Sequence, residues 1–213
     1  MNYEFPIINN ISDVLPAITG RDEFIVAEKE GYTVINYNVM FADTFPNIDV
    51  EEKSIGSGPL RELYDYERYL RSVRRELRGI IFDSATGDII RRPFFKFFNI
   101  NERDETQLNR LDFSKEHWID TKLDGSMIAV FMHHGELIYG TKMVAPDFNE
   151  LVKQFVAASD IDYDSFCRDV IEKGYTPIFE FMHPQKRIVI DYGKPALTLL
   201  AVRNMVTGEF LQL

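Results

Sequence analysis

Short apolar stretches separated by turn residues run along most of the chain, and their spacing predicts β-hairpins. Runs of β-branched and aromatic residues bounded by Gly, Asp or Asn are typical of strands. The predicted hairpins pair Phe24–Ala27 with Tyr32–Tyr37, Arg78–Asp83 with Ile89–Ile90, and Met127–Met132 with Leu137–Gly140. Further strands are predicted at Pro177–Phe181, Arg187–Ile190 and Leu197–Arg203. Repeated hairpins favour antiparallel sheets.

Helical periodicity appears between these strands. Leu151, Val152, Phe155 and Val156 recur at helical spacing and predict a helix over Phe148–Ala158. The other predicted helices are Ile11–Leu15, capped by Ser12 or Asp13, Tyr64–Leu77, and Asp164–Lys173, which ends at Gly174. The Gly- and Pro-containing stretch Ser54–Pro59 is expected to be a surface loop. Hairpins with interposed helices predict one α+β domain over residues 1–213, with antiparallel sheets and flanking helices.

The composition fits a globular protein outside the membrane. The chain has 213 residues, enough for one domain with its own core, and its longest apolar runs have the length of strands. Its start lacks a basic region followed by a long apolar stretch, so we expect no secretory signal peptide. Cys167 is the only cysteine, which excludes an internal disulfide and makes a reducing cytoplasm the simplest location.

The charge is acidic overall but basic in one region. A net charge of −10 argues against nonspecific duplex binding, which needs a broadly basic face. Arginines gather between Arg61 and Lys96, and they allow two interpretations. One is a groove that meets a polyanion. The other, which we favour for Arg68–Arg75, is a solvated helix whose arginines pair with Glu62, Glu67 and Glu76.

The sharpest chemical signal is Lys122–Ser126, which reads K-L-D-G-S. Lys122 lies between the strand-like segment Trp118–Thr121 and a glycine turn, so its amine can be held rigidly over a pocket. The glycine lets a nucleotide approach the backbone closely. A lysine attacks only when neutral, so the pocket must lower its pKa by burial or neighbouring cations. The apolar strand Met127–Met132 is the expected dry wall, and the alternative is a β-turn with an exposed lysine.

K-x-D-G-S is the lysine motif of the covalent nucleotidyltransferases, which include DNA ligases, RNA ligases and capping enzymes. Within that group, the chain resembles the ATP-dependent single-strand RNA ligases of the T-even phage type, from about Tyr32 to its last residue. The similar segments are Tyr37–Asn38, Arg78–Phe82, Arg92–Glu102, Phe179–Phe181 with Pro184 and Arg187–Val189, and Leu199–Arg203 with Thr207–Glu209. The family's R-P-x-x-K-F-F-N-x-N-E run is matched by Arg92–Glu102, and this run points to RNA ligases rather than the other two classes.

The resemblance implies a mechanism and a site. Lys122 would attack the α-phosphate of ATP to form lysyl-AMP, RNA would be adenylylated at its 5′-phosphate, and sealing to a 3′-hydroxyl would release AMP. Mg²⁺ would neutralise the phosphates. The implied nucleotide-site residues are Tyr37, Arg78, Lys96, Phe98, Asp124, Gly125, Lys142 and Glu180, of which Phe98 would pack on the base and Glu180 would bind the ribose or help to hold the metal. The implied substrate is single-stranded RNA or cleaved tRNA, repaired in the cytoplasm of a phage-infected host.

Several of these residues have structural alternatives. Glu180 lies in an apolar strand, where an unpaired carboxylate is costly, so its alternative is an ion pair with Lys186 or Arg187. Lys142 is equally compatible with an ordinary surface position. Because strand neighbours face opposite sides, at least two of one aromatic group are expected in the core: Phe94, Phe95, Phe97 and Phe98.

Two parts of the family's pattern have no counterpart in this sequence. They are a later motif with Glu before Gly, and a K-x-K pair close to the triphosphate. Such lysines orient the pyrophosphate leaving group and stabilise charge in the transition state. The family's C-terminal helical region also has no counterpart. A second hypothesis is therefore a catalytically incomplete nucleotide- or RNA-binding module, which needs a complementing C-terminal polypeptide for activity.

Overall fold

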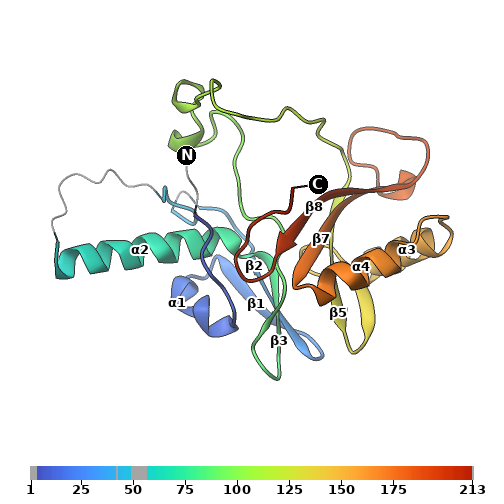
Figure 1. Cartoon of the computed structure of the whole chain (residues 1–213), viewed down its shortest axis with the longest axis horizontal. Coiled ribbons are helices and arrows are strands. Elements are labelled where there is room, and N and C mark those ends of the chain that lie inside the picture. The colour runs from blue at the N-terminus through green and yellow to red at the C-terminus, as the bar shows by residue number, and fades with distance from the viewer. Residues whose placement is uncertain (1–3, 42, 49–56, 213) are drawn as a thin grey trace.

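Two antiparallel four-stranded sheets form the centre of the protein (Figure 1). The computed structural model describes residues 4–41, 43–48 and 57–212. The first sheet has the strand order β1-β2-β3-β4 and the second β6-β5-β7-β8. The strands are β1 (Phe24–Glu28), β2 (Tyr32–Tyr37), β3 (Arg78–Asp83), β4 (Ile89–Arg91), β5 (Ser126–His133), β6 (Glu136–Gly140), β7 (Tyr175–Met182) and β8 (Ala196–Asn204). The predicted α+β class and all three predicted hairpins are confirmed.

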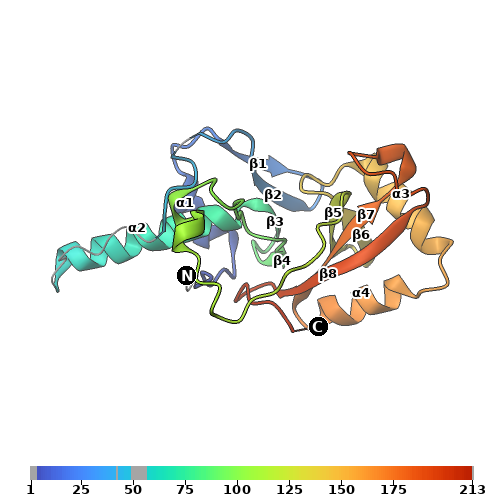
Figure 2. The same cartoon turned by 90° about the horizontal axis from the view of Figure 1, so that it is seen from above.

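The helices lie on the outer sides of the two sheets (Figures 1 and 2). They are α1 (Leu15–Ile18), α2 (Pro59–Glu76), α3 (Pro146–Ala157) and α4 (Tyr163–Glu172), with short 3₁₀ turns at Ile11–Asp13, Asp104–Thr106, Leu108–Arg110 and Pro184–Lys186. α1 and α2 accompany the first sheet, and α3 and α4 accompany the second. No helix in the described ranges is both long and apolar enough to cross a bilayer.

Each sheet is buried on both faces, because successive strand residues point to opposite sides. In β3, Ile80 and Phe82 pack toward α1 and α2, whereas Ile81 packs toward the second sheet. In β5, Ile128 packs toward α3 and α4, whereas Phe131 meets Ile81 between the sheets. The continuous apolar runs that predicted these strands reflect this double burial.

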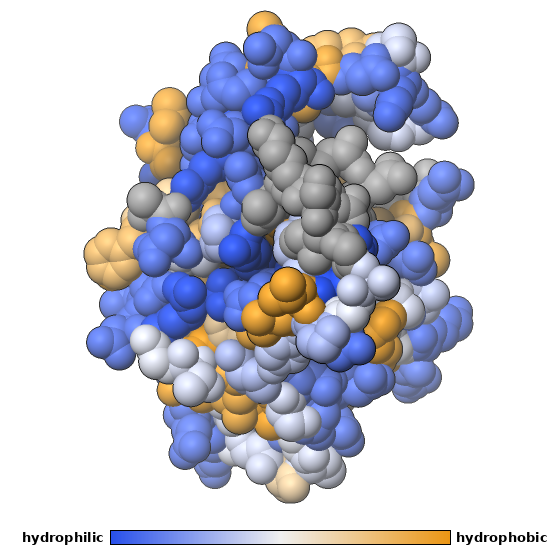
Figure 3. Space-filling model, turned by 90° about the vertical axis from the view of Figure 1, so that its left-hand side faces the viewer, coloured by the Kyte–Doolittle hydropathy of each residue, from blue (hydrophilic) through white to orange (hydrophobic). Residues whose placement is uncertain are grey.

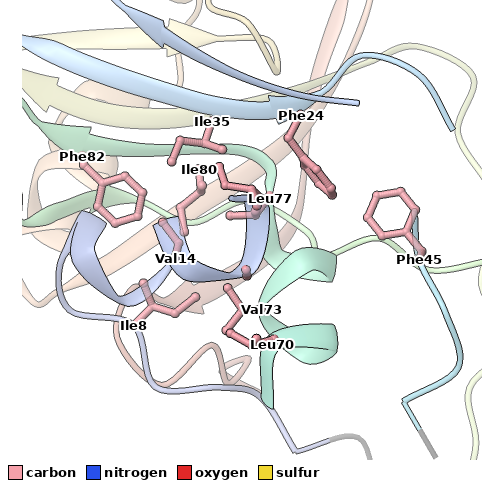
Figure 4. Packing of buried hydrophobic residues seen from close by; sticks show 12 residues of the cluster. Ile8, Val14, Phe24, Ile35, Phe45, Leu70, Val73, Leu77, Ile80 and Phe82 are labelled. Atoms are coloured by element: carbon pink, nitrogen blue, oxygen red, sulfur yellow. The ribbon is translucent and has the colours of Figure 1, made fainter. Parts of the chain in front are cut away.

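The largest cluster of buried side chains fills the space between the first sheet and its two helices (Figure 4). Leu70 and Val73 on α2 belong to one cluster with Ile35 and Ile80 of the sheet and with Val14. Val73, Ile35 and Ile80 are fully buried. Full burial of such a side chain contributes about 1.5–3 kcal/mol relative to exposure, so this cluster fixes the position of α2 on the sheet.

α2 begins five residues earlier than predicted, because Pro59 suits the first turn of a helix, where its missing N–H costs nothing. The predicted loop Ser54–Pro59 therefore ends in a helix, and its first three residues lie outside the described ranges. The free end of α2 carries exposed Leu60 and Leu63. The surrounding face of the molecule is mainly hydrophilic, with separate apolar patches (Figure 3).

Two arginines near the end of α2 are buried, and for this pair both interpretations of the arginine-rich region are wrong. Arg74 and Arg75 are 6% and 3% exposed. Arg74 Nε donates to the carbonyl oxygen of Ala17 at 2.7 Å, and Arg75 forms a two-pronged ion pair with Glu105. Their partners come from distant segments rather than from glutamates of the same helix. These arginines are therefore fold-stabilising groups and face neither solvent nor a polyanion.

A second buried ion cluster joins α2 to the far end of the second sheet. Glu76, Arg92 and Arg203 are all fully buried. Glu76 Oε2 accepts a hydrogen bond from Arg92 Nε at 3.0 Å and lies 2.9 Å from Arg203 Nη2. Arg92 also donates to the carbonyl oxygens of Pro6 and Val206, at 2.9 and 2.6 Å. One carboxylate thus ties together segments from the beginning, middle and end of the chain.

Two predicted strand-like segments are wrong. Arg187–Ile190 forms an irregular loop, and Val189 and Ile190 donate their N–H groups to a side chain instead of a sheet. Trp118–Thr121 has no regular structure, with Trp118 and Ile119 82% and 91% exposed. Their apolar content imitates a buried strand, although neither segment has a neighbouring strand to pair with.

The remaining differences are small. The predicted helix Ile11–Leu15 is a 3₁₀ turn followed by α1, and its cap is Asn10, whose side chain accepts from the N–H of Ser12 at 3.1 Å. The segment after β4 is irregular, so the predicted alternation of its phenylalanines does not apply. Phe94 and Phe98 are nevertheless half-buried against two of the core clusters, which agrees with the expectation that two of the four would pack there.

Candidate active site

Glu180, in the middle of β7, is the carboxylate on which the candidate site centres. Its Oε1 accepts a hydrogen bond from the N–H of Gly125 at 2.9 Å. Burial raises the pKa of Glu180, and the Gly125 hydrogen bond and the charges of Lys122 and Arg78 oppose that rise. These charges act on one carboxyl group although their residues belong to segments far apart in the sequence. The structure therefore brings together three of the predicted charged residues.

Gly125 is required by the close approach of β7. A Cβ at this position would lie 2.5 Å from the carbonyl oxygen of Phe181, which is closer than side chains tolerate. From the sequence, this glycine was predicted to let a nucleotide approach the backbone. The structure gives it a different reason: only glycine lets β5 begin beside β7 and reach the Glu180 carboxylate with its N–H.

Lys122 is exposed, three residues before Gly125 and in a segment without regular structure. The expected burial against β5 is wrong, because the buried residues of that strand begin only at Ile128. An exposed lysine in an Asp-Gly segment is what the turn alternative predicted. Yet its charge acts on Glu180, so Lys122 lies at the rim of the same site and not on an unrelated surface.

Arg78 and Lys142 lie close together where the first sheet meets the chain that leaves the second. Arg78 opens β3, whereas Lys142 follows the end of β6. Burial lowers the pKa of Lys142, and the charge of Arg78 lowers it further. The ammonium nitrogen of Lys142 lies 5.1 Å from the ring centre of Tyr37, in a cation–π contact. Arg78 Nε is buried and has no hydrogen-bond partner among the described residues.

Lys96 is the third cation of the site. Its ammonium group donates to the carbonyl oxygen of Phe97 at 3.0 Å and lies 4.4 Å from the ring centre of Phe98. Burial is the main cause that lowers the pKa of Lys96, and Glu102 opposes it. The charges of three further residues lower it as well: Arg78, Arg103 and Lys142.

Three cations that repel one another thus lie close together, and one of them, Arg78, also acts on the half-buried carboxylate of Glu180. Arg78 lowers the pKa of both Lys96 and Lys142, so each additional positive charge costs energy in the protein as it stands. An anion bound among them would remove that cost. Guanidinium and ammonium groups are the side chains that bind phosphate oxygens best. The arrangement is therefore suited to a polyanionic ligand such as a nucleotide.

A family model described as RNA ligase matches residues 76–213. That match covers more than half of the chain, and it includes every predicted site residue except Tyr37. The chain belongs to the T4-type RNA ligase family.

Two relatives show how this family member compares with longer proteins. A protein described as "Putative RNA ligase" from Thermovibrio ammonificans is 38% identical over 140 residues, which are 65% of this chain and 36% of that protein. RNA ligase 1 of bacteriophage TS2126 is 27% identical over 146 residues, which are 64% of this chain and 36% of that protein. The matched part of the chain thus spans about a third of each relative.

Asp124 of this RNA ligase family member binds the protein's own backbone. Its carboxylate accepts hydrogen bonds from the N–H groups of Val189 and Ile190, both at 2.7 Å, and these bonds lower its pKa. Its own N–H donates to the hydroxyl of Tyr192 at 2.9 Å. The family resemblance predicted that Asp124 belongs to the nucleotide site. In the structure it fastens the loop after β7 to the segment that carries Lys122.

Phe98 also has a different environment from the one predicted. Its ring packs edge-on against Phe45 at 6.3 Å and lies within 5.1 Å of three cations: Arg75, Lys96 and Arg103. A ring with these neighbours organises the cations around it, and its expected stacking on a base is not supported. Arg75 and Arg103 were absent from the predicted set. Arg103 could have been predicted as a neighbour of the site, because it directly follows the R-P-x-x-K-F-F-N-x-N-E run.

The structural alternative for Glu180 is wrong as stated. Arg187 pairs with Asp191 at 3.3 Å, and Lys186 lies over the ring of Phe148 at 5.1 Å. Glu180 instead interacts with Lys122, Arg78 and the N–H of Gly125. A carboxylate that is partly desolvated, and held among cations without a dedicated ion pair to either predicted partner, is typical of a functional position.

Proposed function

We propose that this chain is the nucleotidyltransferase part of an ATP-dependent RNA ligase, with Lys122 as the residue that carries AMP. The observation that carries the proposal is the hydrogen bond from the N–H of Gly125, in the Lys122 segment, to the Glu180 carboxylate at 2.9 Å, on which the charges of Lys122 and Arg78 also act. Membership of the RNA ligase family supports the same reaction class. The complete reaction would join a 5′-phosphate and a 3′-hydroxyl of single-stranded RNA, such as cleaved tRNA.

In the first step, the neutral amine of Lys122 attacks the α-phosphorus of ATP. A P–N bond forms, the bond from the α-phosphorus to the bridging oxygen breaks, and pyrophosphate leaves while the amine loses a proton. The exposure of Lys122 means that the amine is accessible before the nucleotide arrives. The bound nucleotide itself covers the amine, which β5 leaves exposed.

The three cations have distinct tasks in this proposal. Arg78 meets phosphate oxygens with its fork of donors, including the buried Nε that has no partner among the described residues. Lys142 and Lys96 act as point charges on the remaining phosphate or ribose oxygens. Tyr37 holds Lys142 through its ring face. Together they stabilise the charge that develops on the leaving pyrophosphate.

Glu180 is the residue predicted to help to hold a divalent cation, and its carboxylate suits that task. Among the described residues, no group of three or more His, Cys, Asp or Glu side chains could hold a metal by itself. Magnesium is commonly held by one or two carboxylates together with substrate phosphates, so a single Glu180 is compatible with it. Bound there, Mg²⁺ would supply charge neutralisation at the phosphates. The alternative task for Glu180 is a hydrogen bond from the ribose.

Covalent labelling tests the proposal directly. The purified chain is incubated with Mg²⁺ and ATP labelled at the α-phosphate, then denatured and resolved by electrophoresis. We expect a labelled protein band that is absent from Lys122→Ala and persists in Lys186→Ala, an exposed lysine on the nearby 3₁₀ turn. Label on the wild type that survives in Lys122→Ala would contradict the assignment of the nucleophile.

A second candidate function is a nucleotide- or RNA-binding module that becomes active with a complementing polypeptide. The observation in its favour is that the match spans only about a third of each relative. No covalent label, combined with saturable ATP binding that is lost in Arg78→Ala, would select this function. Substrate comparison with single-stranded RNA, nicked DNA and GTP distinguishes an RNA ligase from the related DNA ligases and capping enzymes.

A further inference from the structure

Arg91 is a fully buried arginine whose hydrogen bonds, within the described part of the chain, all go to main-chain carbonyl oxygens. On one side, its Nε and Nη2 donate to the oxygen of Gly79 at 3.0 and 2.7 Å. On the other side, Nη2 donates to the oxygen of Lys142 at 2.9 Å and Nη1 to that of Thr141 at 3.1 Å. The guanidinium thus joins the first sheet to the chain that leaves the second.

Two glycines make room for this contact. A Cβ on Gly140 would lie 2.6 Å from Arg91 Nη1, and a Cβ on Gly79 would lie 2.6 Å from the carbonyl oxygen of Lys142. Gly79 also has φ +86°, a conformation that other residues rarely adopt. The two main chains can therefore approach closely enough for one guanidinium to reach both.

The contacts fall next to two residues of the candidate site. Gly79 directly follows Arg78, and the carbonyl oxygen that receives Nη2 belongs to Lys142 itself. The separation of the Arg78 and Lys142 backbones is thus set by the planar guanidinium of Arg91, which the ring of Phe131 supports at 5.3 Å. The planar guanidinium of arginine has donors in fixed directions, so it defines the distance between two main chains better than the flexible ammonium group of a lysine does.

We propose that Arg91 is a positioning residue for nucleotide binding: it fixes the spacing of Arg78 and Lys142 so that both reach the phosphates of one ATP. The inference rests on the proposed function, because the ligand of Arg78 and Lys142 is assigned there. Arg91 itself touches no substrate. Its charge has no carboxylate partner among the ion pairs of the described residues, so it also adds to the positive potential in which the phosphates are held.

The test uses Arg91→Lys, which keeps the charge but loses the fork, and Gly140→Ala, which keeps Arg91 but displaces its Nη1. Arg74→Lys is the matched control: it is an equally conservative change at a buried arginine that donates to a main-chain oxygen, but on the far side of the first sheet. Melting temperatures show whether the variants are folded and how far each is destabilised.

The readouts are the ATP concentration that gives half-maximal rate of covalent labelling, the maximal rate, and the dissociation constant for α,β-methylene-ATP, which cannot donate AMP to the lysine. We expect Arg91→Lys and Gly140→Ala to raise the half-saturating ATP concentration and the dissociation constant by about tenfold, the equivalent of one charge-assisted contact. Arg74→Lys should leave both within about twofold of the wild type at a similar loss of melting temperature.

The outcomes separate the two claims. If the wild type neither labels nor binds the analogue, the proposed function is rejected and this inference with it. If the wild type labels or binds, but Arg91→Lys and Gly140→Ala change only the melting temperature, the proposed function stands and Arg91 is merely structural. If Arg91→Lys does not fold, Gly140→Ala alone decides between these results.

Discussion

Glu180 occupies a position in which its charge is costly to the fold. Burial raises the pKa of this carboxyl above its ordinary value of 4.5. The folded state then binds the proton more tightly than the unfolded state. Its contribution to stability is complete below the unfolded pKa and is lost as the pH rises through the folded pKa. At neutral pH the ionised Glu180 carboxylate therefore destabilises the fold, as is common for residues that are retained for function.

We therefore expect Glu180→Gln to lose covalent labelling and to gain stability relative to the wild type as the pH rises from about 4 to about 7. The amide oxygen of glutamine still accepts from the N–H of Gly125, so the strand contact is retained. Urea unfolding of both proteins across this range measures the difference in unfolding free energy. A difference that does not vary with pH would show that Glu180 is not held in a desolvated state.

Gly125→Ala is expected to lower the unfolding free energy by about 1–3 kcal/mol, because its Cβ would meet the main chain of Phe181, which cannot move aside easily. Labelling should fall as well, because the N–H of Gly125 moves away from Glu180. Gly20→Ala is the comparison: at Gly20 φ is +72° and a Cβ meets nothing within 4 Å, so only backbone strain is added. Equal losses in labelling for the two variants would contradict the steric explanation.

At the scale of single residues, the sequence predicted which charged side chains lie in the candidate site. It predicted their burial and their hydrogen-bond partners less well. Arg78, Lys96, Lys142 and Glu180 could be found because their motifs keep order and spacing. Lys122 and Asp124 lie in or contact irregular loops. Such loops have no hydrophobic periodicity, so the sequence could not predict the exposure of Lys122 or the backbone partners of Asp124. Arg91 carries no motif, and its burial follows only from the meeting of two sheets.

At the scale of elements, one carboxylate controls an irregular loop. Asp124 binds two consecutive N–H groups of the segment that follows the 3₁₀ turn Pro184–Lys186. Asp124→Ala is expected to release this loop and to increase trypsin cleavage after Lys186 and Arg187 by about tenfold, because protection follows the free energy of local opening. Mass spectrometry of the first cleavage products measures the rate at each site.

Asp191→Ala provides the control for that experiment. It removes the exposed Arg187–Asp191 ion pair, whose side chains are 55% and 58% exposed. Exposed pairs contribute little, so cleavage should change by less than about twofold. If Asp191→Ala opened the loop as strongly as Asp124→Ala, the two N–H bonds to Asp124 would not be what holds it.

Hairpins and amphipathic helices were predictable because each is decided by neighbours in the sequence. β1 with β2, β3 with β4 and β5 with β6 all form as expected. The strand predicted at Arg187–Ile190 was wrong because local preference alone does not make a strand. β-branched residues favour a strand, but a strand also needs a neighbouring strand to pair with, and that depends on the whole fold. The pairing of β7 with β5, which places Glu180 beside Gly125, was likewise not available from local pattern.

At the scale of the whole molecule, Glu76 holds distant segments together. Its carboxylate is the partner of both Arg92 and Arg203, and all three are fully buried. Glu76→Ala would leave two arginines without their counter-charge, so we expect a loss of about 3–5 kcal/mol in unfolding free energy. Chemical denaturation measures it, with Glu62→Ala in the exposed first turn of α2 as the control. A loss below about 1 kcal/mol would show that the main-chain bonds of the arginines suffice.

The two sheets have separate hydrophobic cores, which meet around Ile81 and Phe131 and are also joined by the buried groups of Arg91 and Glu76. Because these groups link the halves, the empty protein should melt in a single transition. A ligand held by Arg78 on one sheet and Glu180 on the other adds its binding free energy to that transition. Nucleotide occupancy would then be visible calorimetrically as a melting temperature that rises with the ATP concentration.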